Sequence, residues 1–146
     1  MTALPSRRAA LAGALSLAVL PMAARATPET MRAAIAELAA GRVPRDGRVR
    51  IDIQPLVDNG NTVPMRVWVE GPADIRAIHV FNERNPQPHV LSLAFGPAAA
   101  EPSLATRIRL ADTQTVVALA EAEDGTLWRA SVEVIVTIAA CVEGLV

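Results

Sequence analysis

The feature that most restricts the fold of this chain is an alternation of apolar and mostly charged residues with a period of two. It runs over residues 48–53 and again over 65–69. A period of two places successive side chains on opposite faces of a strand. Five further strands are predicted at 75–82, 90–95, 104–110, 115–122 and 131–138, between turn signals such as Asp58-Asn59-Gly60-Asn61, Gly71-Pro72-Ala73-Asp74 and Asp124-Gly125. About seven short strands predict an all-β protein, built as an antiparallel β-sandwich.

A short helix is predicted ahead of these strands. Thr27 can cap it, Pro28 suits its first position, and Glu29 lies where the helix dipole favours a negative charge. Gly41 is expected to end the helix. Its apolar residues follow helical spacing and form one stripe that has to pack against another element, namely Met31, Ala34, Ile35, Leu38 and Ala39.

Residues 1–26 have the pattern of a twin-arginine-type signal peptide. The pair Arg7 and Arg8 precedes an uncharged apolar run over 9–20, and Ala24-Arg25-Ala26 offers small residues for cleavage after Ala26. The general secretory route is the alternative route of export. A membrane anchor is less favoured, because a spanning helix needs about 20 apolar residues. We therefore expect a periplasmic protein, free of the membrane after cleavage, with one domain over 27–146.

The charge of this mature segment excludes one class of partner. The signal removes three of the 14 basic residues, all of them arginine, which leaves 11 against 15 acidic residues and a net charge of −4. A surface of this sign does not favour binding to nucleic acid or to an anionic membrane.

The sequence contains few groups typical of an enzyme. It has no glycine-rich phosphate loop, and its two histidines cannot form a three-histidine zinc site. His79 is interpreted as a satisfied core or interface histidine and His89 as a solvated loop residue. Either would reach Cys141, for a metal site or a Cys–His dyad, only through folding. We predict no catalytic residue, no metal and no cofactor.

Six other residues that could belong to a site have simpler interpretations. Carboxylates at polar strand positions or in turns are expected on solvated faces, and the two tryptophans are expected to pack or to contact a partner. These residues are Asp52, Asp58, Glu70 and Asp74, and Trp68 and Trp128.

Cys141 is the sole cysteine, so the chain cannot form an internal disulfide. It follows the last predicted strand after two small residues, Ala139 and Ala140, and precedes Val142-Glu143-Gly144. Small neighbours would let residues 139–146 act as an arm that enters a narrow cleft in another protein. A small buried hydrophobe is the alternative, with Leu145 and Val146 folded back on the sandwich. The residues themselves leave both interpretations open.

Between about Arg32 and Cys141 the chain resembles the SoxY family, the sulfur-carrier subunits of periplasmic thiosulfate oxidation. The resemblance rests on the order and spacing of five segments, which are Ile78-His79-Val80-Phe81, Asn85-Pro86-Gln87-Pro88, Thr106-Arg107-Ile108-Arg109-Leu110-Ala111 with Gln114, Asp124-Gly125, and Val136-Thr137-Ile138-Ala139-Ala140-Cys141. It implies an immunoglobulin-like sandwich, twin-arginine export and a heterodimer with a SoxZ-like partner subunit. It also implies that Cys141 bears covalent sulfur intermediates and presents them to separate sulfur-oxidation enzymes.

The segment around Cys141 departs from the typical family pattern. SoxY proteins typically end in Gly-Gly-Cys-Gly-Gly, whereas this chain has Ala139-Ala140-Cys141-Val142-Glu143. Alanine lacks the conformational freedom of glycine, so a stiffer arm is expected. The pattern is closer to a SoxY-related branch with an Ala-Ala-Cys-Ile-Glu arm, and the resemblance does not identify its cargo. The alternative function is a binding or structural module of a SoxYZ-like complex with an unreactive, buried cysteine.

Overall fold

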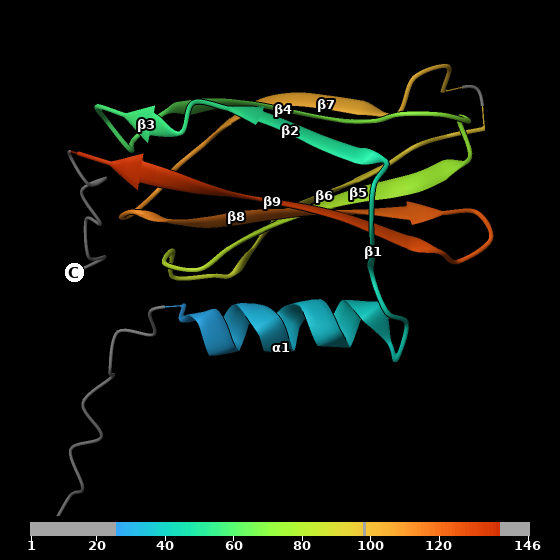
Figure 1. Ribbon diagram of the computed structural model, residues 1–146, viewed down its shortest axis with the longest axis horizontal. Helices are drawn as coiled ribbons and strands as arrows, with labels where there is room; N and C mark the ends of the chain where they lie inside the picture. Colours follow the sequence, from blue (N-terminus) through green and yellow to red (C-terminus); the bar gives the residue numbers. More distant parts are fainter. Residues whose placement is uncertain (1–25, 98, 138–146) are drawn as a thin grey trace, which may run out of the picture.

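The computed structural model describes residues 26–97 and 99–137, and these form three layers. The helix α1 (Pro28–Ala39) covers one face of a larger β-sheet, and a smaller sheet covers the other face (Figure 1). Among the described residues, no helix has the length and apolar character needed to cross a membrane. The all-β sandwich with a preceding helix is therefore confirmed.

The larger sheet has the strand order β1-β9-β8-β5-β6, and β3 also pairs with β9. Its long central strands pair antiparallel, with β8 between β5 and β9. The bounds of these strands are β1 (Arg45–Asp46), β3 (Leu56–Val57), β5 (Ile75–Asn82), β6 (His89–Ala94), β8 (Gln114–Ala122) and β9 (Leu127–Val136).

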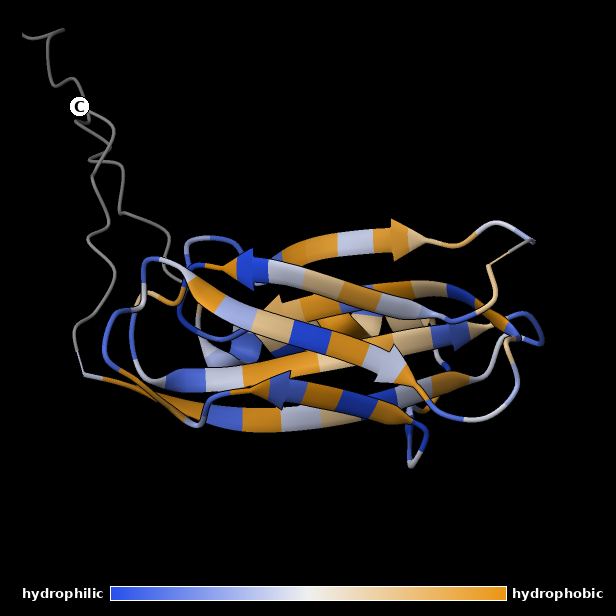
Figure 2. Ribbon diagram, turned by 90° about the horizontal axis from the view of Figure 1, so that it is seen from above, coloured by the Kyte–Doolittle hydropathy of each residue, from blue (hydrophilic) through white to orange (hydrophobic). Residues whose placement is uncertain are grey.

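The smaller sheet contains β2 (Val49–Ile53), β4 (Val63–Val69) and β7 (Ser103–Ile108), with β4 in the middle. Along β4 the residues alternate between buried and more exposed, as the period of two predicted. Figure 2 shows the same alternation as bands of apolar and polar colour along the strands. The inward side chains of the two sheets form one core, which includes Val67, Ile78, Val80, Val116 and Val134, each fully buried.

The helix begins and ends as its sequence indicated. Thr27 and Thr30 form a capping box, in which each side chain accepts a hydrogen bond from the other residue's backbone N–H. The helix ends at Ala39, and Ala40 and Gly41 both follow with left-handed backbone angles, at φ 48° and 85°. Its apolar stripe packs on the outer face of the larger sheet, where Met31 meets Phe81, Val117 and Leu119.

Two strands differ from the expected antiparallel pattern. β1 and β3 each contain two residues, and both pair parallel with β9, near its beginning and its end respectively. The chain runs from β1 in the larger sheet to β2 in the smaller one and returns at β3. Two residues are too short to show a period of two, so the sequence could not indicate them. β9 begins at Leu127 rather than at residue 131, because Gly125, at φ 84°, closes a tight turn directly after β8.

Candidate functional site

The residue predicted to carry sulfur, Cys141, lies outside the described residues. The arm residues that flank it lie outside as well, namely Ala139, Ala140, Val142, Glu143 and Gly144, and so do the signal residues Arg7 and Arg8. The described chain reaches Thr137, four residues before Cys141. The surroundings of Thr137 therefore define the base from which the predicted arm departs. We call this end of the sandwich, with its loops 58–62, 83–88 and 109–113, the arm end.

The last residues of β9 are held from two sides. The Thr137 N–H donates to the carbonyl of Val57 at 3.0 Å, and its hydroxyl donates to the carbonyl of Asp58 at 3.1 Å. The N–H of Val136 donates to the hydroxyl of Thr113 at 3.0 Å. Because these partners belong to β3 with the loop that follows it and to the loop 109–113, the base of the arm keeps a fixed position on the sandwich.

A network of neutral side chains around Asn85 joins the loops of the arm end. Its amide nitrogen donates to the carbonyl of Arg109 at 2.7 Å, and its amide oxygen accepts from the N–H of Ala111 at 3.0 Å. The same oxygen accepts from Nε2 of Gln114 at 3.3 Å, and Oε1 of Gln114 accepts from the N–H of Arg84 at 2.9 Å. Buried Gln114 begins β8 and pairs in register with Val134 of β9. The Asn85 network therefore connects both loops to the strand beside the arm base.

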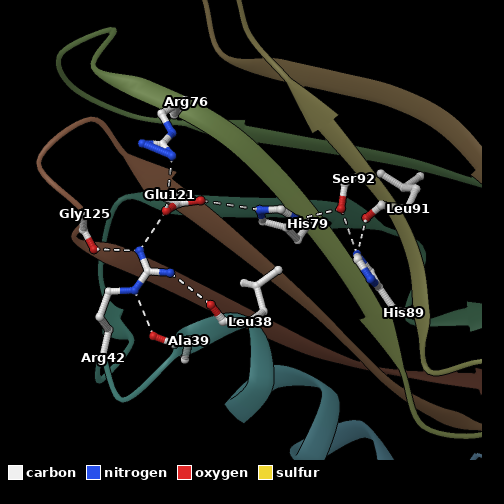
Figure 3. Close-up of polar contacts among 10 residues, drawn as sticks. All are labelled: Leu38, Ala39, Arg42, Arg76, His79, His89, Leu91, Ser92, Glu121 and Gly125. Carbon is white, nitrogen blue, oxygen red and sulfur yellow. Dashed lines mark hydrogen bonds and ion pairs between the residues drawn. The ribbon is translucent and has the colours of Figure 1, made fainter.

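A second polar group, which we call the His79 cluster, lies between α1 and the larger sheet (Figure 3). His79 on β5 is only 8% exposed, and its Nδ1 lies 2.7 Å from the hydroxyl of Ser92, which is 2.9 Å from Nε2 of His89. Nε2 of His79 lies 4.0 Å from the carboxylate of Glu121, and Arg42 binds that carboxylate at 2.7 Å. The structure thus brings the two histidines together, with ring centroids 5.9 Å apart.

The charges in this cluster serve the attachment of the helix. Arg42 also donates to the carbonyls of Leu38 and Ala39, so it binds the last turn of α1 to the sheet. The hydrogen bond from Arg42 lowers the pKa of Glu121. Burial, and secondarily the electrostatic effect of the nearby His89, lowers the pKa of His79, against an opposing effect of Glu121. His79 is therefore uncharged at neutral pH, and its Nε2 is buried without a hydrogen-bond partner in the described structure.

The interpretations of the two histidines are confirmed in part. His79 is buried as predicted, but only one of its ring nitrogens is satisfied. His89 is exposed at the first position of β6, where its ring stacks on Phe81 at 4.7 Å between centroids. Among residues 26–97 and 99–137, no group of three or more potential ligand side chains could hold a metal ion. A contact between either histidine and Cys141 lies outside the described residues.

The other residues weighed from the sequence mostly lie where they were expected. Asp52, Asp58 and Glu70 are exposed. Asp74 is half-buried and binds Arg48 at 2.8 Å, and this hydrogen bond lowers the pKa of Asp74.

The two tryptophans lie in different surroundings. Trp128 packs against the core, and its ring nitrogen is buried without a partner in the described structure. Trp68 lies on the outer face of the smaller sheet, where the guanidinium of Arg66 is 5.4 Å from its ring centroid.

Sequence reasoning missed three residues that support these two networks. Thr113 accepts from the N–H of Val136, 23 residues later, and Arg42 binds Glu121, 79 residues later. The two histidines were singled out from the sequence, and the side chains of Asn85 and Gln114 only as parts of the family resemblance, without a structural role. A threonine that binds the end of a strand from a distant loop, or an ion pair between distant elements, leaves no local pattern that identifies it.

Comparison with known proteins agrees with the resemblance noted in the sequence. Residues 33–141 match the family model described as sulfur oxidation protein SoxY. The structure of the sulfur carrier protein SoxY from Chlorobium limicola f thiosulfatophilum superposes with a TM-score of 0.66 and 30% identity, over 75% of this chain and 98% of that one. This likeness confirms the immunoglobulin-like sandwich. No curated protein sequence matches the chain.

The fold is shared with proteins of another activity. A superoxide reductase (neelaredoxin) from Ignicoccus hospitalis superposes with a TM-score of 0.54 and 25% identity, over 62% of this chain and 80% of that one. The same sandwich therefore occurs in a sulfur carrier and in a redox enzyme, so the fold alone does not define the activity.

Proposed function

Because the chain belongs to the SoxY family of sulfur-oxidation proteins, we propose that it carries sulfur intermediates covalently on Cys141 and presents them to separate enzymes. The observation that carries this proposal is that the family match extends to residue 141, the sole cysteine of the chain. A carrier needs an attachment point on a stable handle. The fixed base at Thr137, four residues before the thiol, is consistent with that need.

In this proposal the protein is a carrier and does not itself catalyse a reaction. The thiolate of Cys141 would form the bond to sulfur, and other proteins would transfer and release the cargo. The proposal includes a SoxZ-like partner subunit in a heterodimer and export to the periplasm by the twin-arginine route. The cargo is left open, because Val142 and Glu143 replace the glycines that typically follow the family's cysteine.

Intact-mass analysis of the mature protein tests the attachment. Protein isolated from its own periplasm during growth on reduced sulfur compounds should show added masses of sulfur or sulfur oxides. These additions should disappear in a Cys141→Ser strain and after reduction. A single unmodified mass, together with a thiol inert to alkylating reagents in the folded protein, would contradict the proposal.

The alternative role is a structural module with a buried cysteine, and it predicts a different rate of sulfur oxidation when Cys141 is replaced. A Cys141→Ser strain should then oxidise sulfur compounds at the rate of the parent. Under the carrier proposal the same strain should lose that oxidation, although the variant still folds and binds its partner subunit.

A further inference from the structure

A shallow groove of about 870 Å³ crosses the outer face of the smaller sheet at the arm end. It lies where β2 ends, β4 begins and β7 ends, and its lining includes Gln54, Pro64, Arg66 and Arg107. In register, Pro64 on β4 faces Arg107 on β7, so both point away from the core. The face on which this groove lies is the one farther from α1 (Figure 1).

Two arginines give this groove its positive charge. Within the described residues, the guanidinium groups of Arg66 and Arg107 form no hydrogen bond and no ion pair, whereas Arg48 and Arg50, toward the other end of β2, are paired with carboxylates at 2.8 and 2.9 Å. Asp52 is the only carboxylate among the described residues of the lining, and it lies opposite Arg66 in the strand register. The groove therefore has a net positive charge and donors free for an oxyanion, which arginine binds through two parallel hydrogen bonds.

The groove lies within reach of the predicted attachment point. Gln54 in its lining is three residues from Val57, and the carbonyl of Val57 accepts a hydrogen bond from Thr137. Three extended residues span about 10 Å, so the rim of the groove is within roughly 13 Å of the arm base. The four residues from Thr137 to Cys141 span about 14 Å when extended, which suffices to bring the sulfur to the rim.

We propose that the Arg66–Arg107 groove is a docking site for the protein's own arm when Cys141 bears an anionic sulfur oxide. The ligand class is a sulfonate or thiosulfonate group on residues 138–146 of the same chain. This inference rests on the proposed carrier function and adds a resting position for its cargo. Docking would shelter the charged adduct between visits to the enzymes, and an uncharged thiol would leave the groove open.

The adduct for the test can be made chemically on the mature protein. The thiolate of Cys141 attacks a central sulfur of tetrathionate, forms a new S–S bond, and displaces thiosulfate, which leaves with the electron pair of the broken S–S bond. The product is a Cys141 adduct of the form S–S–SO₃⁻, which ends in one negatively charged sulfonate group. Alkylation of Cys141 with iodoacetamide gives a neutral adduct of the same thiol as the reference.

NMR signals of the arginine Nε–H groups then report docking. In the thiosulfonate form the signals of Arg66 and Arg107 should shift from their positions in the alkylated form, equally at high and at tenfold lower protein concentration. The Arg66→Gln and Arg107→Gln variants should each lower the ratio of docked to free arm roughly fivefold, as judged by the shift that remains at the other arginine. Arg50→Gln, on the same face but outside the groove lining, is the matched control and should keep the full shift.

Three outcomes would overturn the docking site, each with a different meaning. Identical arginine signals in the two loaded forms would contradict the docking alone and leave the carrier proposal intact. Shifts that grow with protein concentration would show that the groove receives the arm of a second copy rather than its own. A Cys141 thiol that does not react with tetrathionate in the folded protein would contradict the carrier proposal and the docking together.

Discussion

The Asn85 network joins the loops of the arm end, whereas the His79 cluster joins α1 to the larger sheet. The two use different kinds of side chain. The Asn85 network uses neutral amide groups that mostly bind backbone atoms of loops. The His79 cluster uses side chains that titrate or carry charge, and it joins the end of a helix to a sheet. Neutral groups keep their hydrogen bonds at any pH, whereas the pairing of histidine and glutamate changes with protonation. The hydrogen bonds of Asn85 and Gln114 therefore do not change with pH, whereas the contacts that attach the helix do.

The largest loss of stability is expected when the central residue of the Asn85 network is removed. Asn85→Ala takes away the partners of Arg109, Ala111 and buried Gln114, and should lower the free energy of unfolding by about 2–3 kcal/mol. Urea unfolding measures this loss. Gln87→Ala, an exposed residue of the same loop, is the control and should change stability by less than about 0.5 kcal/mol. Equal effects of the two variants would show that the network does not hold the arm end together.

A smaller effect is expected from Arg42→Ala on the other side of the sheet. It removes the bonds to Leu38, Ala39 and Glu121, and should cost about 1–2 kcal/mol, because the arginine is partly exposed to solvent. Hydrogen exchange should show the loss of protection concentrated in α1. Arg45→Ala is the exposed control, for which no change in exchange is expected. A loss of protection at the arm end instead would contradict the conclusion that Arg42 holds α1 and that the two networks act separately.

The smallest expected effect is a change of stability with pH. It should arise from the His79 cluster and not from the Asn85 network. Because the pKa of His79 is lowered from 6.5 in the native protein, the unfolded chain binds more protons just below pH 6.5. Stability should therefore fall as the pH drops below 6.5 and level off below the native pKa of His79. Glu121, whose pKa is lowered from 4.5, adds a further loss only at more acidic pH.

His79→Gln keeps a hydrogen-bonding group near Ser92 and removes the first of these two changes. Urea unfolding between pH 5 and 7.5 should show a flatter stability profile for this variant. Asn85→Ala should lower the whole profile without changing its slope in that range. A parent protein whose stability does not change over this range would show that the buried histidine is not coupled to folding.

Much of the fold could be predicted from local pattern, and the exceptions have clear reasons. The helix and the strands of the smaller sheet each bury one face, so their periodicity is present in the sequence, as in β4 and in the stripe beginning at Met31. β5 and β8 are buried on both faces, between the smaller sheet and α1, and were predicted as strands between turn signals. The two-residue strands β1 and β3 could not be predicted, because they exist only through pairing with β9. Asn85 and Gln114 could be selected by resemblance, but the hydrogen bond between them depends on how the loop 83–88 approaches the start of β8.

The sequence by itself determined the alternation that builds two sheets, the caps of the helix, and a single cysteine as the candidate attachment point. These are properties of neighbouring residues, and short-range sterics, hydrogen bonding and burial are enough to express them. Only the tertiary structure decided that Thr113 and Val57 fix the base of the arm, that His79 meets His89 and Glu121, and that Arg66 and Arg107 share a groove. Each of these groupings joins strands or loops distant in sequence, so only the packing of the two sheets and the helix creates it.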